Sequence, residues 1–275
     1  MEILTKLTPA ETYLLEAGNL SVYKNMLKYT MADLITKKVL AFENRGLPFS
    51  EEIAHYITRG SNYDTYKPLP HERPFTDSLQ YDPNFEILFK DLVKIAYQKI
   101  GGQRKYVFQY LVEQPTVKES IQTGFFKRLF NTISFTAVGE KNRSEVTAAI
   151  KKLEETFPRL IEENPAAARE ILNKIGGNIY LLKSFDFQLL SKLDEEFKKT
   201  PGELADTAVY DGTGDLLFWS YFMFDEFSHD FEGSYDAFDS DGGGWGDFGG
   251  DSGDFGGDSG CSGCSGCGGC GGCGG

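Results

Sequence analysis

Cysteine is absent from the first 260 residues of this 275-residue chain, and Lys and Arg are absent from its last 71. All five cysteines lie between positions 261 and 273, whereas the segment from Ala205 onward has 14 acidic residues and no Lys or Arg. The first 204 residues hold all 28 basic residues and the other 27 of the 41 acidic residues, so they are close to neutral. The acidity is therefore confined to the C-terminal segment, which disfavours binding of nucleic acid or an anionic membrane by that segment.

A long apolar run is also missing. The longest one, Leu216 to Phe224, is far shorter than the roughly 20 residues that a membrane-spanning helix needs. Residues Met1 to Lys6 show no basic stretch followed by an apolar one, as a signal peptide would. We therefore expect a soluble, cytoplasmic protein without a membrane partner. In a reducing compartment, an odd number of thiols favours metal binding or covalent chemistry over a disulfide framework.

The first 204 residues lack the usual catalytic motifs. They contain no glycine-rich phosphate loop before a predicted helix, no nucleophile elbow and no zincin helix. Their only histidines are His55 and His71, and neither is surrounded by other ligands at the spacing of a metal site. His71 lies in a loop beside Glu72 and Arg73, where a lone histidine is typically a surface residue. We predict that the protein is not an enzyme and has no catalytic residues.

The residues that are present favour a mainly α fold with minor β structure, arranged as two small helical lobes. Thr8-Pro9-Ala10-Glu11 has the pattern of a capping box and predicts a helix that stops at Gly18. Residues 21–38 carry apolar side chains at helical spacing. A short strand that turns at 44–46 follows, and Ser50 is predicted to open a further helix that reaches Arg59.

Helices followed by a short hairpin are typical of a winged-helix-like lobe, which we place at residues 1–60. Its middle section is basic, as a DNA-reading helix needs to be. A solvated helix face is the alternative, because no Arg cluster or base-reading pattern accompanies the lysines. The candidate phosphate contacts are Lys24, Lys28, Lys37 and Lys38.

A connector rich in Pro, Asn and Asp is predicted for residues 61–83, before a second helical lobe at 84–204. This lobe opens with a helix from Phe85 to Ile100, whose apolar residues form one stripe and which ends at Gly101-Gly102. The remaining predicted elements are helices over 105–113 and 117–130, a strand over 133–138 turned by Gly139, a helix from Val146 bent or restarted at Pro158, a helix from Asn164-Pro165 to Gly176-Gly177, and a helix over 184–199.

Residues of the N-terminal lobe and the cysteine tail together resemble a known pattern. The spacing of Leu7, Pro9, Glu11, Leu14, Gly18, Met31, Leu34 and Leu40 resembles the opening segment of an uncharacterised bacterial protein family. In that family a helix-turn-helix-like N-terminal segment is separated from a low-complexity Gly/Cys-rich C-terminal tail. The same spacing is similar to that of Golgi phosphoprotein 3-like proteins, which bind phosphoinositide headgroups. The first resemblance implies an architecture and no activity, and the second implies a membrane-surface role.

An acidic aromatic segment occupies residues 205–239. Its aromatic rings are numerous, and each buried ring is worth about 2 kcal/mol or more of transfer free energy. We therefore predict that Leu216 to Phe227 docks on the body as a helix. Membrane insertion is the alternative, which nearby Asp225, Glu226 and Asp230 disfavour.

The tail, residues 240–275, is predicted to be disordered. Asp247-Phe-Gly-Gly-Asp-Ser-Gly253 is repeated without change as residues 254–260, and cysteines then follow at every third position. Such a segment cannot bury an apolar core, so its chemistry is that of its thiols. The candidate metal ligands are Cys261, Cys264, Cys267, Cys270 and Cys273.

Three hypotheses fit this cysteine ladder. As metal ligands, Cys-x-x-Cys steps are suited to Zn, Cu(I) or an iron–sulfur cluster. As a substrate, the tail resembles the Gly/Cys-rich core of ribosomally made, post-translationally modified peptides, with the body as leader and a tail-modifying enzyme as partner. Incidental thiols are the third hypothesis. We predict a non-catalytic binding or scaffold protein with another protein as its partner, and keep the precursor, DNA-binding and membrane-surface functions as alternatives.

Overall fold

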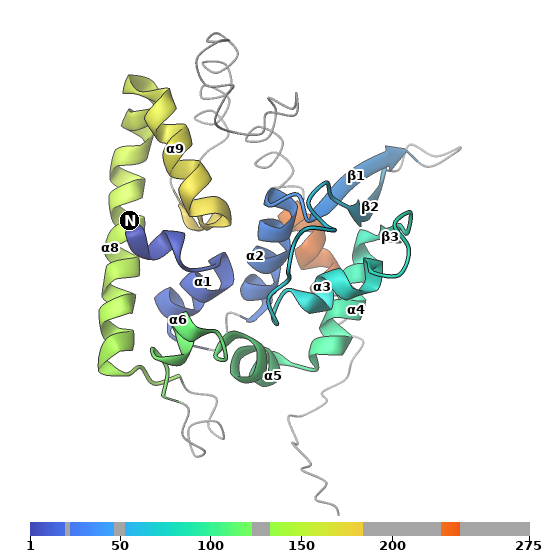
Figure 1. The fold of residues 1–275 in the computed structure, drawn as a ribbon, viewed down its shortest axis with the longest axis horizontal. Helices are drawn as coiled ribbons and strands as arrows, with labels where there is room; N and C mark the ends of the chain where they lie inside the picture. Colours follow the sequence, from blue (N-terminus) through green and yellow to red (C-terminus); the bar gives the residue numbers. More distant parts are fainter. Residues whose placement is uncertain (20–22, 47–52, 123–132, 184–226, 237–275) are drawn as a thin grey trace, which may run out of the picture. The chain divides into compact units, whose positions relative to one another are not determined.

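The computed structural model describes residues 1–19, 23–46, 53–122, 133–183 and 227–236 (Figure 1). These residues are mainly helical with a small three-stranded antiparallel sheet, which confirms the predicted fold class of mainly α with minor β. They all belong to one unit, Met1–Gly243, and the second unit, Gly244–Gly275, lies outside the described residues. No described helix is both long enough and apolar enough to cross a bilayer.

The N-terminal elements begin as the capping pattern predicts. A short 3₁₀ helix, η1 (Glu2–Thr5), precedes α1 (Pro9–Ala17). At the start of α1, the Thr8 hydroxyl accepts from the Glu11 amide, and the Glu11 carboxylate accepts from the Thr8 amide at 2.7 Å. The helix ends at Gly18, whose left-handed backbone (φ 68°) suits glycine.

An antiparallel hairpin follows α2 (Tyr23–Thr36) and replaces a predicted helix. β1 (Leu40–Gly46) pairs along its whole length with β2 (Ile53–Arg59), and Phe42 faces Ile57 across the pair. The helix predicted to start at Ser50 was therefore wrong for residues 53–59, and residues 44–46 continue a strand instead of turning. Ser50-Glu-Glu has the pattern of a helix start, but the run Tyr56-Ile57-Thr58 after it consists of aromatic and β-branched residues, which fit a strand with a pairing partner.

The second half of the sheet leads into the most regular predicted helix. After α3 (Arg73–Thr76) and the 3₁₀ turn η2 (Asp77–Leu79), β3 (Ile87–Leu88) pairs with β2. α4 (Phe89–Ile100) starts four residues later than predicted, because Phe85 lies exposed before the strand. Its buried stripe and its left-handed cap at Gly101 are as predicted.

The helices after α4 differ more from the predicted elements. α5 (Gln103–Lys105), the π-helical turn η3 (Tyr106–Leu111) and α6 (Pro115–Lys118) are short. The strand predicted over 133–138 was wrong, since only one bridge joins Phe135 to Ile121. Thr136 instead caps α8 (Ala137–Glu163), with its hydroxyl accepting from the Gly139 amide.

The last two helices of the body form a pair. α8 passes through Pro158 without ending or restarting. Asn164 then caps α9 (Pro165–Ile175) as predicted, and the 3₁₀ helix η4 (Gly176–Leu181) follows it. Figure 1 shows α8 and α9 side by side, with α1 also packed against α8. The predicted helix at 184–199 lies outside the described residues.

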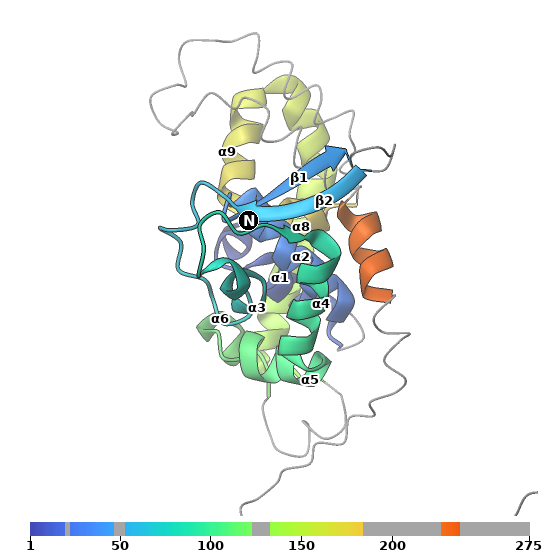
Figure 2. The same ribbon diagram turned by 90° about the vertical axis from the view of Figure 1, so that its right-hand side faces the viewer.

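Residues 227–236 form one more helix, which we call the docked helix. Figure 2 shows it in orange beside α4 and the β1–β2 hairpin. Of the segment 205–239, only this part is described, and its Phe227 and Phe231 belong to a hydrophobic core of the body. The stretch 216–226, where we placed the docking helix, lies outside the described residues.

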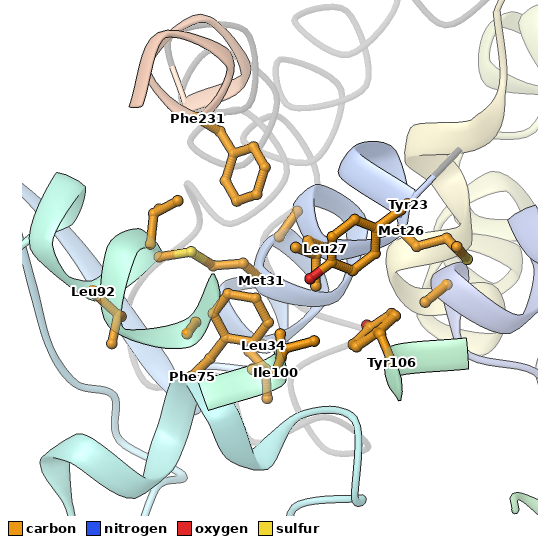
Figure 3. Close-up of a cluster of buried hydrophobic side chains, with 14 of the residues drawn as sticks. Tyr23, Met26, Leu27, Met31, Leu34, Phe75, Leu92, Ile100, Tyr106 and Phe231 are labelled. Carbon is orange, nitrogen blue, oxygen red and sulfur yellow. The ribbon is translucent and has the colours of Figure 1, made fainter. Parts of the chain in front are cut away.

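Two hydrophobic cores cross the lobe boundaries that the sequence predicts. The first joins α2, the sheet and α4 to the docked helix (Figure 3), and the second joins η1 and part of α1 to α8, α9 and η4. α1 serves both, because Leu14 faces the first core and Leu15 the second. The segment 1–60 thus shares its cores with the segment 84–204 instead of enclosing one of its own.

Candidate functional site

The docked helix binds the body through three aromatic rings at helical spacing. Phe227, Phe231 and Tyr235 are each four residues apart, so they lie on one face of the helix. Phe227 and Phe231 are almost completely buried, at 2% and 0% exposure. Figure 3 shows Phe231 pointing from the helix into the cluster that contains Met31 of α2 and Leu92 of α4.

Aromatic rings from four elements line the groove that receives the docked helix. Phe227 packs edge-on against Phe42 of β1 and Phe89 of α4, at centroid distances of 6.1 and 5.3 Å. At the other end, the Tyr235 ring meets those of Tyr23 and Tyr97 at 6.3 and 5.3 Å. His55 of β2 stacks on Phe42 and completes the wall near Phe227. We call this surface of α2, α4, β1 and β2 the aromatic groove.

Acidic residues of the docked helix meet basic residues at the rim of the groove. Asp236 lies 2.8 Å from the Lys24 ammonium, and Glu232 lies 3.0 Å from that of Lys28. Asp230 lies 3.1 Å from Nε2 of His55, an ion pair when the imidazole is protonated. The charges of helix and groove are therefore complementary along the helix.

The aromatic contacts and the ion pairs contribute different amounts of binding free energy. Burying a Phe side chain contributes about 1.5–3 kcal/mol, and an edge-to-face pair adds roughly 0.5–1.5 kcal/mol. A solvent-exposed ion pair contributes only about 0.2–1 kcal/mol. Glu232 and Asp236 are about half and two-thirds exposed, although the Lys28 side chain is only 11% exposed, so the rings supply most of the binding free energy and the ion pairs add to it.

The four lysines predicted to contact phosphate do not form one surface. Lys24 and Lys28 share the rim of the aromatic groove, where both are paired with the docked helix. Lys37, in the turn after α2, is paired with Asp33 instead. Lys38 follows it with a left-handed backbone (φ 54°). The structure thus places Lys24 and Lys28 together at the rim, whereas Lys37 and Lys38 lie in the turn after α2.

Lys37 belongs to a buried polar network that the sequence analysis missed. Its ammonium lies 2.6 Å from the Asp33 carboxylate, 3.4 Å from that of Glu72 and 3.2 Å from the Tyr66 hydroxyl. The Glu72 carboxylate also accepts from Tyr66 and from the Leu69 amide, and Asp33 accepts from the Gly177 amide. This network joins α2 to the loop before α3 and to η4.

Burial and the neighbouring charges act in opposite directions on the pKa values of Asp33 and Lys37. Burial raises the pKa of Asp33, although the Lys37 ammonium opposes that rise. For Lys37 itself burial favours the neutral amine, but Asp33 and Glu72 outweigh it and raise the pKa above its usual value. Lys37 is therefore held protonated and cannot act as an amine nucleophile at neutral pH.

His71 lies next to this network, and its prediction as a surface residue was wrong. Its side chain is fully buried, with Nε2 3.5 Å from the Thr8 hydroxyl, and Nδ1 has no hydrogen-bond partner within the described part of the chain. Burial lowers the pKa of His71 to about 4, so the imidazole is neutral at pH 7. On the other side of Thr8, burial raises the pKa of Glu11, which accepts from the Thr116 hydroxyl. These residues join α1 to α6 and to the loop before α3.

The described residues hold no group of three or more His, Cys, Asp or Glu positioned to bind a metal ion. The predicted ligands Cys261, Cys264, Cys267, Cys270 and Cys273 lie outside the described part of the chain. Comparison of the sequence with family models and curated proteins, and of the structure with solved structures, finds no match. The resemblance to a bacterial family stays a prediction, and function has to be inferred from the residues of this chain.

A periodic signal could have located the docked helix in the sequence. Phe227, Phe231 and Tyr235 recur every four residues, with acidic residues between them. The docking helix was instead predicted at 216–227, where aromatic residues are denser. The basic partners of these acidic residues lie more than 170 positions earlier in the chain, so a local pattern cannot reveal them.

Proposed function

We propose that the chain is a non-catalytic scaffold protein whose body holds a thiol-bearing C-terminal tail. The observation that carries this proposal is the docking of residues 227–236 in the aromatic groove. Only 24 residues separate Asp236 from Cys261, so the groove tethers the cysteines to the body at a short distance along the chain.

The tail is the part that acts chemically. We propose that its five cysteines bind a soft metal ion such as Zn or Cu(I), or an iron–sulfur cluster, or are covalently modified. In support, cysteine occurs nowhere else in the chain, and the unbroken three-residue period is that of a chelating thiolate ladder. No Lys or Arg after position 204 competes for contact with the thiolates.

Intact mass spectrometry of the full-length protein, purified natively from cells, tests this function. Chelation predicts metal adducts that disappear on acidification, because protons compete for the thiolates. A matched chain with all five cysteines changed to serine should show no adduct. A native mass without adduct or modification, together with five alkylatable thiols and no uptake of added metal, would refute it.

The same spectrum identifies the alternative precursor function. A cysteine converted to an azole loses water and two hydrogens, which is about 20 Da, and a disulfide loses about 2 Da per pair. A mass lower by about 20 Da for each modified cysteine would favour a modified peptide precursor with a tail-modifying enzyme as partner.

The DNA-binding and membrane-surface alternatives concern the N-terminal segment. The order α1, α2, hairpin is in keeping with a winged-helix-like arrangement, but Lys24 and Lys28 are already paired, so phosphate binding would require the docked helix to leave. Gel-shift and liposome-flotation assays should therefore compare the native chain with Glu232→Gln/Asp236→Asn. Binding by neither protein at low salt would exclude both alternatives.

A further inference from the structure

The contacts between the docked helix and the aromatic groove resemble those between a peptide and the protein that binds it. Residues that contact each other across this interface, such as Lys28 and Glu232, are 204 positions apart. The contacts have the pattern of a peptide helix bound in a groove, with anchors at every fourth residue and complementary charges on the rim. Nothing in these contacts depends on the helix and the groove belonging to the same copy.

The chain between the body and the docked helix is long. Residues 184–226, which are 43 positions, join Lys183 to Phe227. A segment of this length spans about 65 Å as a helix and about 140 Å when fully extended. Chain length therefore allows the helix to reach the groove of a neighbouring copy.

We propose that the aromatic groove also binds the docked helix of a second copy of this chain, so that two copies exchange helices. Every copy carries both the groove and a helix with the matching rings and charges, so a reciprocal exchange satisfies both grooves at once. Exchange also brings two cysteine tails, with ten thiols, into one assembly.

Binding within one copy competes with this exchange. A tethered helix reaches its own groove at an effective concentration that is on the order of millimolar for a short connection and falls as the connection lengthens. At micromolar protein concentration the native chain should therefore be mostly monomeric. The exchange becomes measurable when binding within each copy is weakened and binding between copies is not.

Charge reversal creates this situation in two full-length variants. The groove variant carries Lys24→Glu and Lys28→Glu, and the helix variant carries Glu232→Lys and Asp236→Lys. In each variant alone, like charges oppose each other at the two rim positions. In an equimolar mixture, the acidic helix of one meets the basic groove of the other, and the basic helix meets the acidic groove.

Sedimentation velocity at low salt, with a reductant and a chelator to keep the tails apart, measures the outcome. We expect each variant alone to be monomeric and the mixture to form a 1:1 dimer at least tenfold more tightly than either variant self-associates. High salt should weaken the dimer. The variant with all four reversals restores pairing within one chain and should be monomeric, which shows that the reversed charges themselves do not cause association.

Circular dichroism and thermal melting establish that both variants are folded before they are mixed. If folded variants remain monomeric when mixed, the groove does not accept the helix of a second copy, and the proposal is wrong. Dimerisation of the variant with all four reversals would also refute it, since the association would then arise from another surface.

Discussion

Replacing Lys37 by methionine should destabilise the protein far more than the same change at the surface. The substitution keeps the unbranched aliphatic stem but removes the only ammonium within 4 Å of the buried Asp33 and Glu72 carboxylates that the described part of the chain supplies. Those side chains are 4% and 1% exposed, so water cannot take over the role of the ammonium. The variant must keep two buried carboxylates without a counter-charge or protonate them.

The magnitude follows from burial. Removing one partner of a buried ion pair costs about 3–5 kcal/mol, because the other charge remains buried. The Lys37 side chain is 34% exposed, so we expect the lower end of that range, about 3 kcal/mol at pH 7.5. For a chain of this size the melting temperature should fall by roughly 6–12 °C.

Lys174→Met is the matched control. Lys174 pairs with Glu170 at the same 2.6 Å and in the same i, i+4 order as Lys37 with Asp33, but both of its side chains are more than 60% exposed. An exposed helix pair contributes only about 0.3–0.5 kcal/mol. Chemical denaturation of the two variants therefore isolates the effect of burial at constant geometry.

The pH dependence gives a second check. Without Lys37, the folded-state pKa of Asp33, which burial already raises, should rise further above that in the unfolded chain. A group with a raised folded pKa destabilises the fold as pH increases through that value, so the loss should be smaller at pH 5.5 than at pH 7.5. Asp33→Asn added to Lys37→Met should recover part of it. A loss below about 1 kcal/mol at pH 7.5, or one that does not change with pH, would refute this account of the network.

Three further predictions concern Gly139, His71 and the C-terminal tail. Gly139→Ala should destabilise the fold by about 1–3 kcal/mol, because a Cβ there would overlap the Ser120 carbonyl. Gly46→Ala is the control, since its Cβ would meet nothing within 4 Å. Chemical denaturation measures the stability of both variants, and equal stabilities would contradict the overlap. The pKa of His71 is lowered from 6.5 to about 4, so the unfolded chain binds a proton that the folded chain does not. As the pH falls from 6.5 to 4, the free energy of unfolding should therefore decrease by up to about 3 kcal/mol relative to that of His71→Gln. Parallel pH profiles of the two proteins would show that His71 does not destabilise the fold at low pH. Limited proteolysis should release about the last 40 residues first, and a protease-resistant tail in metal-free protein would contradict the predicted disorder of residues 240–275.

Local hydrogen bonding explains which elements could be predicted. The cap at Thr8 and the left-handed end at Gly101 depend on residues within four positions of each other, so their patterns are visible in the sequence. The stripe of α4 is visible for the same reason. The strand Ile53–Arg59 was misassigned because its identity depends on β1, while its own first residues have the pattern of a helix start.

The class of fold, the helix ends at Thr8, Gly18 and Gly101, and the confinement of every cysteine to an acidic, glycine-rich tail can be predicted from the sequence alone. These are properties of composition and of neighbours along the chain. Only the tertiary structure decided that His71 is buried, that Lys37 faces Asp33 and Glu72, and that Lys28 is paired with Glu232. Each of these contacts either spans distant parts of the chain or depends on which side of a helix is covered. A local sequence pattern contains neither kind of information, because the packing of the whole body determines which element covers a given side chain.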